Sequence, residues 1–146
     1  MRIAGLFAFV VVFLFGANVS ARDDWLMFPI KDAMSTPDAQ QKLNRDVRFY
    51  FSGQSHPKVL HTFGEFQSNK KTNAFNKSDK EACEWVFLSA MLSFQDRVQE
   101  MGGNAVIDIK SYYKKHLVES PTEYECGAGF MLAGVTFRGT IVTLAK

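Results

Sequence analysis

The side chains of this 146-residue protein that could do chemistry are few: two cysteines and three histidines. Histidine can ligate a transition metal together with cysteine or a carboxylate, but tight sites usually present their ligands in pairs at short spacing. His56 and His61 are separated by four residues that include a proline, and His116 has no such neighbour. A metal or small-ligand carrier that uses these histidines is therefore the second hypothesis, and no cofactor is predicted.

Catalytic arrangements are also weakly represented. A nucleophilic serine is often exposed on a G-x-S-x-G turn, and this pattern does not occur in the sequence. Three carboxylates, Glu119, Glu123 and Glu125, cluster around a predicted turn, where we expect them to be solvated. We therefore predict a non-catalytic protein and keep an enzyme of an unrecognised class as the third hypothesis.

The paired glycines Gly102 and Gly103 could hold a phosphate only if they preceded a helix, because the free amide groups and the positive dipole end lie at the helix N-terminus. They follow a predicted helix instead. The sequence also lacks the G-x-x-x-x-G-K-[ST] motif, so it does not predict a P-loop ATPase. We expect Gly102 to end the helix with a positive φ and Gly103 to let the chain turn back.

Basic and aromatic residues form a candidate patch for an anionic partner. Stacking on a tyrosine combined with lysine charge would suit such a partner. The alternative is a solvated sheet edge whose lysines prevent aggregation. The partner would be an envelope protein or an anionic envelope polymer rather than nucleic acid. The residues of this patch are Lys70, Lys71, Lys77, Lys110, Tyr112 and Lys114.

The first 21 residues are typical of a cleavable signal peptide. Arg2 precedes an apolar run over residues 3–15, and Val19, Ser20 and Ala21 provide small residues for cleavage. The run is shorter than the roughly 20 residues of a membrane-spanning helix. We therefore expect a periplasmic or secreted protein with no stable membrane insertion after cleavage.

Charge and cysteine content fit this expectation. Without Arg2, the 17 basic residues fall to 16 against 15 acidic residues, so no global field favours nucleic acid. Exported proteins fold where thiols are oxidised, so we expect a disulfide between Cys83 and Cys126. The alternative, a redox-active thiol pair, lacks the C-x-x-C motif.

The clearest predicted element is a long helix. Ser78 and Glu81 form a capping box at its start. Apolar residues then recur every three or four positions, which is typical of a helix packed on a core. This stripe consists of Cys83, Phe87, Ala90, Met91, Phe94, Val98 and Met101. Trp85, Leu88 and Leu92 broaden it, so the helix either is deeply packed or contributes to a subunit contact in a homo-oligomer.

Strands are predicted on both sides of this helix. Residues 47–51 and 59–66 precede it, and the polar segment 68–77 is a loop or the frayed end of the second strand. After it, Ala105, Ile107 and Ile109 share one face, opposite Lys110, Tyr112 and Lys114. Residues 123–126 begin a return strand. The last strand, within residues 130–144, changes its apolar parity, for which we favour a bulge at Arg138 and Gly139 over a turn.

These elements predict an α+β fold with two layers, in which one long helix packs on a mainly antiparallel sheet of four to five strands. Residues 47–146 would form one domain. Residues 22–46 would form an irregular lead with a short helix that begins at Thr36 and Pro37 and ends near Leu43. This lead could lie over the domain or swing free.

Two segments carry a resemblance to known families. GGNAVIDIKS (102–111) and AGVTFRGTIVTL (133–144) resemble YbjQ-like domains, which are described as heavy-metal-binding, and more distantly the sensor domain of RcsF. The match covers about Val47 to Leu144 and implies a two-layer α+β domain without a defined reaction. The whole chain, including SNKKTNAFNKSDKEACEW (68–85), is similar to exported bacterial proteins labelled as an excinuclease ATPase subunit. That label does not suit a chain without a P-loop or zinc-finger cysteine pairs.

The leading hypothesis is therefore a periplasmic module that acts by binding or sensing.

Overall fold

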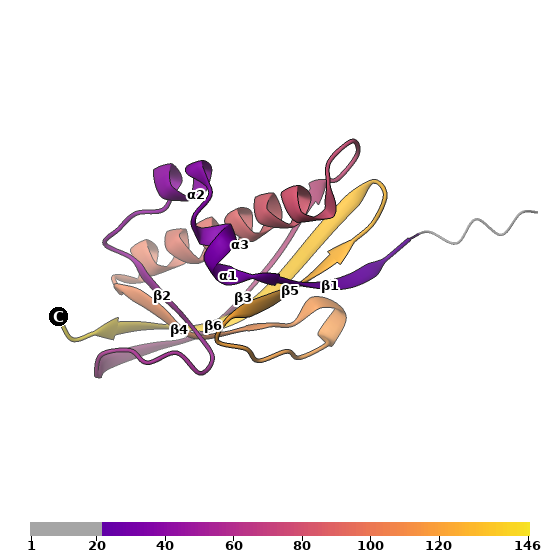
Figure 1. Cartoon of the computed structure of the whole chain (residues 1–146). Helices are drawn as coiled ribbons and strands as arrows, with labels where there is room; N and C mark the ends of the chain where they lie inside the picture. Colours follow the sequence, from indigo (N-terminus) through magenta and orange to yellow (C-terminus); the bar gives the residue numbers. More distant parts are fainter. Residues whose placement is uncertain (1–21) are drawn as a thin grey trace, which may run out of the picture.

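The computed structural model describes residues 22–146, so the predicted signal peptide, residues 1–21, lies outside the described residues. The fold is α+β, as predicted: a six-stranded sheet with one long helix along one face (Figure 1). The strands are β1 (Asp24–Pro29), β2 (Arg48–Phe51), β3 (Val59–Asn73), β4 (Ala105–Ser111), β5 (Glu123–Ala128) and β6 (Leu132–Leu144). The helices are α1 (Ile30–Met34), α2 (Pro37–Lys42), α3 (Asp79–Met101) and the 3₁₀ turn η1 (Tyr113–Lys115).

Strand β6 is the centre of the sheet. One of its edges pairs antiparallel with β3 over the length of both strands. Its other edge pairs first with β5 and then with β4, and both pairings are antiparallel. β1 adds antiparallel to β5, and β2 adds parallel to β4. The sheet is therefore mainly antiparallel, and every strand is attached to β6 directly or through one neighbour.

The N-terminal lead is part of the sheet, which corrects the prediction of an irregular segment and of four to five strands. Leu26 and Phe28 of β1 pack against the core, whereas Trp25 and Met27 are exposed. This alternation has the period of a strand, but it is only six residues long. The short helix is confirmed as α2, and the Thr36 hydroxyl accepts a hydrogen bond from an amide of its first turn.

Helix α3 begins and ends as predicted. Ser78 Oγ accepts a hydrogen bond from the Glu81 amide at its start. Gly102 ends the helix with a φ of +78°, and the Gly103 amide donates to the Val98 carbonyl. The predicted stripe is buried from Cys83 to Val98, and only its last member, Met101, is exposed. Leu88 is buried by residues of its own chain. No helix within residues 22–146 is long and apolar enough to cross a membrane.

Strand β6 has no bulge at Arg138 and Gly139, contrary to the prediction, because its pairing with β3 is regular there. Its change of apolar parity has another cause. Side chains such as Phe137 face α3, whereas Val142 and Leu144 pack with Ala105 in a second, smaller core cluster on the opposite face. β6 is therefore buried on both faces.

The bulge lies in β4 instead. Asp108 has a φ of +52°, and the pairing of β4 with β6 shifts between Ile107 and Lys110. As a result, Ile109 faces the α3 side with Val106, and not with Ala105 and Ile107 as predicted. β4 also ends at Ser111, before the tyrosines that were assigned to it.

Strand β3 continues to Asn73, so most of the polar segment 68–77 is regular strand and not loop. Its sequence gives little sign of this because its side chains are almost all polar. Pairing with the apolar β6 fixes it, and Ser68 is buried opposite Phe137.

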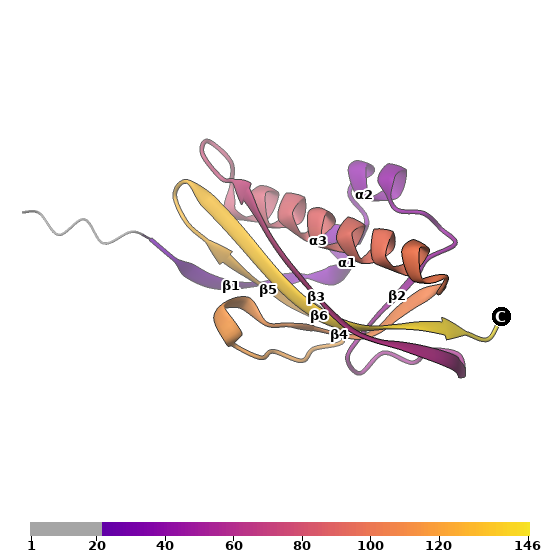
Figure 2. The same ribbon diagram turned by 180° about the vertical axis from the view of Figure 1, so that it is seen from behind.

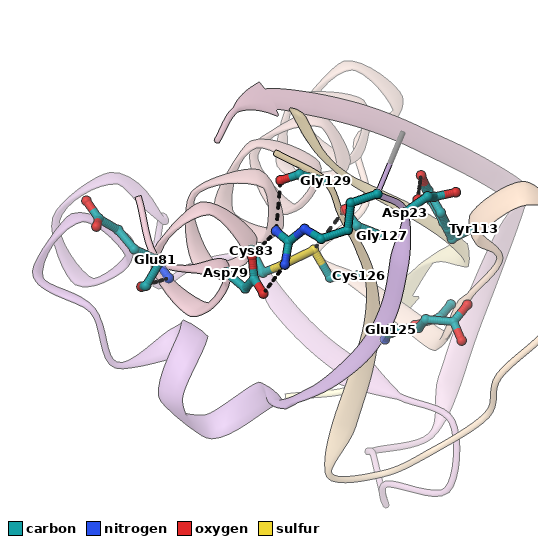
Figure 3. The surroundings of a disulfide bond; sticks show 12 residues. Asp23, Asp79, Glu81, Cys83, Tyr113, Glu125, Cys126, Gly127 and Gly129 are labelled. Atoms are coloured by element: carbon teal, nitrogen blue, oxygen red, sulfur yellow. Dashed lines mark hydrogen bonds and ion pairs between the residues drawn. A yellow bond between two sulfur atoms is a disulfide. The ribbon is translucent and has the colours of Figure 1, made fainter. Parts of the chain in front are cut away.

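The predicted disulfide joins the two layers. Cys83 of α3 and Cys126 of β5 are bonded, and both are completely buried (Figure 3). The Tyr124 and Phe87 rings pack next to it with their centroids 4.7 Å apart. The bond therefore lies within the main core, near the start of α3.

Replacing both cysteines, Cys83→Ala with Cys126→Ala, should lower the free energy of unfolding by about 4 kcal/mol, because the unfolded chain regains the entropy of an open loop. Urea unfolding monitored by circular dichroism measures this. The native protein in reductant is the matched control and should unfold at the same urea concentration as the variant. A loss below about 1 kcal/mol would show that the bond contributes little.

Candidate functional site

A cavity of about 570 Å³ lies where the β5–β6 hairpin turns, on the face of the sheet opposite α3. Its apolar wall consists of Gly129, Phe130 and Met131 in the hairpin turn and of Leu132, Ala133 and Gly134 at the start of β6. Polar and charged residues line the remainder: Arg22, Asp23, Lys71, Tyr113 and Lys114. Figure 2 shows the η1 turn on the side of the sheet away from α3, beside the β5–β6 hairpin. The cavity volume is in the range of small-molecule sites.

Tyr113 forms one wall because two glycines allow its ring to lie directly on the sheet. A Cβ atom would lie 2.2 Å from this ring at Gly127 and 2.9 Å from it at Gly134, both closer than atoms can approach. These two glycines are paired across β5 and β6. The turn that carries Tyr113 is fixed by backbone hydrogen bonds, including one of 2.8 Å from the Tyr112 amide to the Thr136 carbonyl.

An acidic residue anchors the turn to the N-terminal segment. The Tyr113 hydroxyl donates to Asp23 Oδ1 at 3.2 Å (Figure 3). The Lys114 ammonium group binds Oδ2 of the same carboxylate. The hydrogen bond from Lys114 lowers the pKa of Asp23. Burial raises the pKa of the Tyr113 hydroxyl, and the charge of Asp23 raises it further. The tyrosine therefore remains a neutral donor, and Asp23 remains an anion that neutralises Lys114.

Arg22 connects three elements at the same end of the molecule. Its guanidinium group makes two hydrogen bonds, of 2.7 and 3.1 Å, with the Asp79 carboxylate at the start of α3. It also donates to the Gly129 carbonyl at 3.1 Å, in the hairpin. The hydrogen bond from Arg22 lowers the pKa of Asp79. Arg22 is thus largely neutralised by its own partners.

Lys71 differs from these two cations. Its position opposite Gly134 in the β3–β6 register places its side chain on the cavity face of the sheet. It is exposed and makes no ion pair within residues 22–146. The cavity therefore combines an apolar wall with one cation that no neighbouring acid balances.

The structure brings together only part of the predicted basic patch. Lys71 and Lys114 line the same cavity, although they come from β3 and η1. Lys70 pairs with Val135, which faces α3, and so lies on the opposite face of the sheet. The Lys77 ammonium group donates to the Asn73 carbonyl in the β3–α3 loop.

The other two members of that patch are engaged elsewhere. Lys110 lies 3.3 Å from Asp108 and 3.8 Å from Glu119. The Arg138 guanidinium group lies over the Tyr112 ring, 4.6 Å from its centroid. A single strand face carrying Lys110, Tyr112 and Lys114 is therefore wrong, because the chain leaves the strand at Ser111. Tyr113, the next residue, is the aromatic side chain at the cavity.

The three histidines do not come together. Within residues 22–146, no group of three or more metal-ligating side chains is present. His56 lies beside Tyr50, and His61 lies beside Phe63 on β3. His116 follows η1 and contacts Trp25 of β1.

His116 and Glu125 form the strongest pair of potential ligands. His116 Nδ1 lies 2.9 Å from Glu125 Oε2, and Trp25 covers the imidazole ring at a centroid distance of 5.1 Å. Glu125 is only 4% exposed, so it is not solvated as predicted, because β5 directs it under the η1 turn. One histidine and one carboxylate are fewer ligands than a stable metal site requires.

Sequence reasoning missed most of the cavity wall. Phe130 and Met131 were assigned to the start of an apolar strand, but they form the hairpin turn and are 66% and 55% exposed. Leu132 does begin β6, but its side chain is 55% exposed. The signal for a turn was Gly129, which directly precedes three large apolar residues. Arg22 was missed because the lead was predicted to be irregular.

Comparisons with known proteins add no relative: no family model, curated protein or solved structure matches this chain.

The packing of Tyr113 on the glycines can be tested by a double-mutant cycle. Gly127→Ala should lower the free energy of unfolding by about 1–3 kcal/mol, because the new methyl group overlaps the ring. In a Tyr113→Ala background the same change should cost much less. Urea unfolding of the four proteins measures both values, and equal costs in the two backgrounds would contradict this packing.

Proposed function

We propose that this protein is a periplasmic binding module that holds a single-chain anionic amphiphile in the cavity between the η1 turn and the β5–β6 hairpin. The observation that carries the proposal is the combination of an apolar wall with Lys71 at its rim. The apolar chain of the ligand would lie along Phe130 to Leu132. Its anionic group would meet the Lys71 ammonium group.

The apolar part of the site supports a ligand with a hydrocarbon portion. Phe130, Met131 and Leu132 leave more than half of their surface exposed. Covering them with a hydrocarbon chain removes apolar area from water, which stabilises a complex by about 25 cal/mol per Å² of area buried. An inorganic anion alone would leave this area uncovered.

The charges support an anionic group. Lys114 and Arg22 are held by Asp23 and Asp79, so an incoming anion would compete with these carboxylates at either cation. Lys71 offers a charge without such competition. The Tyr113 hydroxyl is already committed as a donor to Asp23, so Lys71 is the residue that would select for charge.

The compartment and the family belong to the same proposal. The disulfide and the predicted signal peptide support export to the periplasm. The likeness to YbjQ-like and RcsF-like domains is also proposed here, and it rests on the two quoted segments. A carrier that holds a metal through all three histidines has less support, because they contact different neighbours.

Isothermal titration calorimetry tests this function. Protein purified from the periplasm is titrated with dodecanoate below its critical micelle concentration. We expect saturable binding of one molecule per chain, and weaker binding of the uncharged glycerol ester. Lys71→Glu should weaken dodecanoate binding about tenfold or more, because an attraction becomes a repulsion.

Lys58→Glu is the matched control, because it makes the same charge change beside the opposite end of β3. It should bind dodecanoate like the native protein. Absence of saturable binding, or equal binding by Lys71→Glu and the native protein, would refute the function.

A further inference from the structure

We infer that the end of the molecule formed by the β3–α3 loop and the β5–β6 hairpin is a docking surface for an anionic membrane. We call it the apolar tip and define it by Phe75, Phe130, Met131 and Leu132. The inference goes beyond the proposed function, because it concerns a surface that reaches outside the cavity. Phe75 belongs to the tip and does not line the cavity.

The apolar tip is an ordered surface, because its two loops are joined by a hydrogen bond and by an aromatic contact. The Ala74 amide donates to the Met131 carbonyl at 2.8 Å, and the Gly129 amide closes the hairpin through the Leu132 carbonyl at 2.8 Å. The Phe75 and Phe130 rings meet edge to face with their centroids 5.7 Å apart. The two phenylalanines are therefore presented together, from loops that are about 55 residues apart in sequence.

The four side chains of the tip are large, apolar and exposed to between 46% and 66%. Exposed apolar clusters of this kind mark surfaces that bind a partner or a membrane, because leaving them in water is unfavourable. Other large apolar side chains are exposed as well, such as Leu60 at 62% and Leu117 at 52%, but the tip gathers four of them from two loops that are in contact. The tip is therefore suited to an occupant outside the described residues.

Charge favours an anionic surface as that occupant. The segment 66–78, which forms the end of β3 and its loop, contains Lys70, Lys71 and Lys77 and no acidic residue. The segment 126–137, which contains the hairpin, has no charged residue. Aromatic and aliphatic side chains that insert into the interface, next to lysines that meet lipid headgroups, are typical of peripheral membrane binding.

The direction of the chain supports a membrane over other partners. The start of β1 lies at the same end of the molecule as the hairpin and the β3–α3 loop, and the C-terminus lies at the opposite end (Figures 1 and 2). Residues 1–21, with the apolar run of residues 3–15, join the chain at this end.

Vesicle sedimentation of the mature periplasmic protein tests the inference. We expect binding to vesicles of phosphatidylcholine with 30% phosphatidylglycerol, and much weaker binding to pure phosphatidylcholine. Phe75→Ser with Phe130→Ser should lower the affinity for the anionic vesicles about tenfold or more, because two inserted rings are lost. Leu60→Ser is the matched control: Leu60 is 62% exposed and lies at the opposite end of β3, so its loss should have no effect.

Tryptophan fluorescence provides a second measurement. The emission of a Phe130→Trp variant should shift to the blue with anionic vesicles and should be quenched by brominated lipid. Leu60→Trp should show neither effect. Near-ultraviolet circular dichroism confirms that each variant is folded.

Three results would overturn the docking surface. The first is absence of binding to anionic vesicles, and the second is equal vesicle binding by the native protein and the Phe75→Ser/Phe130→Ser variant. The third is a native dimer in light scattering that becomes a monomer in this variant, which would assign the tip to a contact with a second copy. The single variant Phe75→Ser separates this inference from the proposed function. It should weaken vesicle binding while leaving dodecanoate binding unchanged, whereas Lys71→Glu should weaken dodecanoate binding about tenfold or more.

Discussion

The rest of the structure depends on one constraint: β6 is packed on both of its faces. On one face, a Cβ at Gly139 would lie 2.6 Å from Val106, so only glycine lets β6 fit beneath the core side chains under α3. On the other face, Gly134 does the same for the Tyr113 ring. These glycines are five residues apart and therefore point to opposite faces. One strand thus sets both the depth of the core and the position of the cavity wall.

This arrangement explains how the cavity, the disulfide and the apolar tip come to share one end of the molecule. β5 carries Cys126 toward α3 and Gly127 toward Tyr113, as successive residues of a strand must. Arg22 then ties the N-terminal segment to the start of α3 and to the hairpin. The hairpin turn is held from both sides while its apolar side chains remain outside the core. A surface that is fixed and uncovered in this way is suited to binding.

The sequence predicted the elements with strong local signals and missed those decided by distant partners. Helix α3 has a cap, an apolar period and a terminal glycine, so its limits were predictable. The polar end of β3 is a strand because β6 lies beside it, and no local pattern shows that. At the site, Lys71 and Lys114 were identified from the sequence, but Tyr112 was predicted where the structure has Tyr113. The difference arises because β4 bulges at Asp108 and ends at Ser111. Bulges and turns depend on backbone angles that these residue types do not specify.

Nuclear magnetic resonance with isotope-labelled protein and decyl phosphate tests the central claim most directly, because it locates a ligand without assuming a site. The account predicts saturable shifts confined to Lys71, to Tyr113 and Lys114, and to residues 129–134, with contacts between the alkyl chain and the Tyr113 ring. Shifts centred on α1 and α2, or on the β2 edge, or no saturable shift at all, would contradict it.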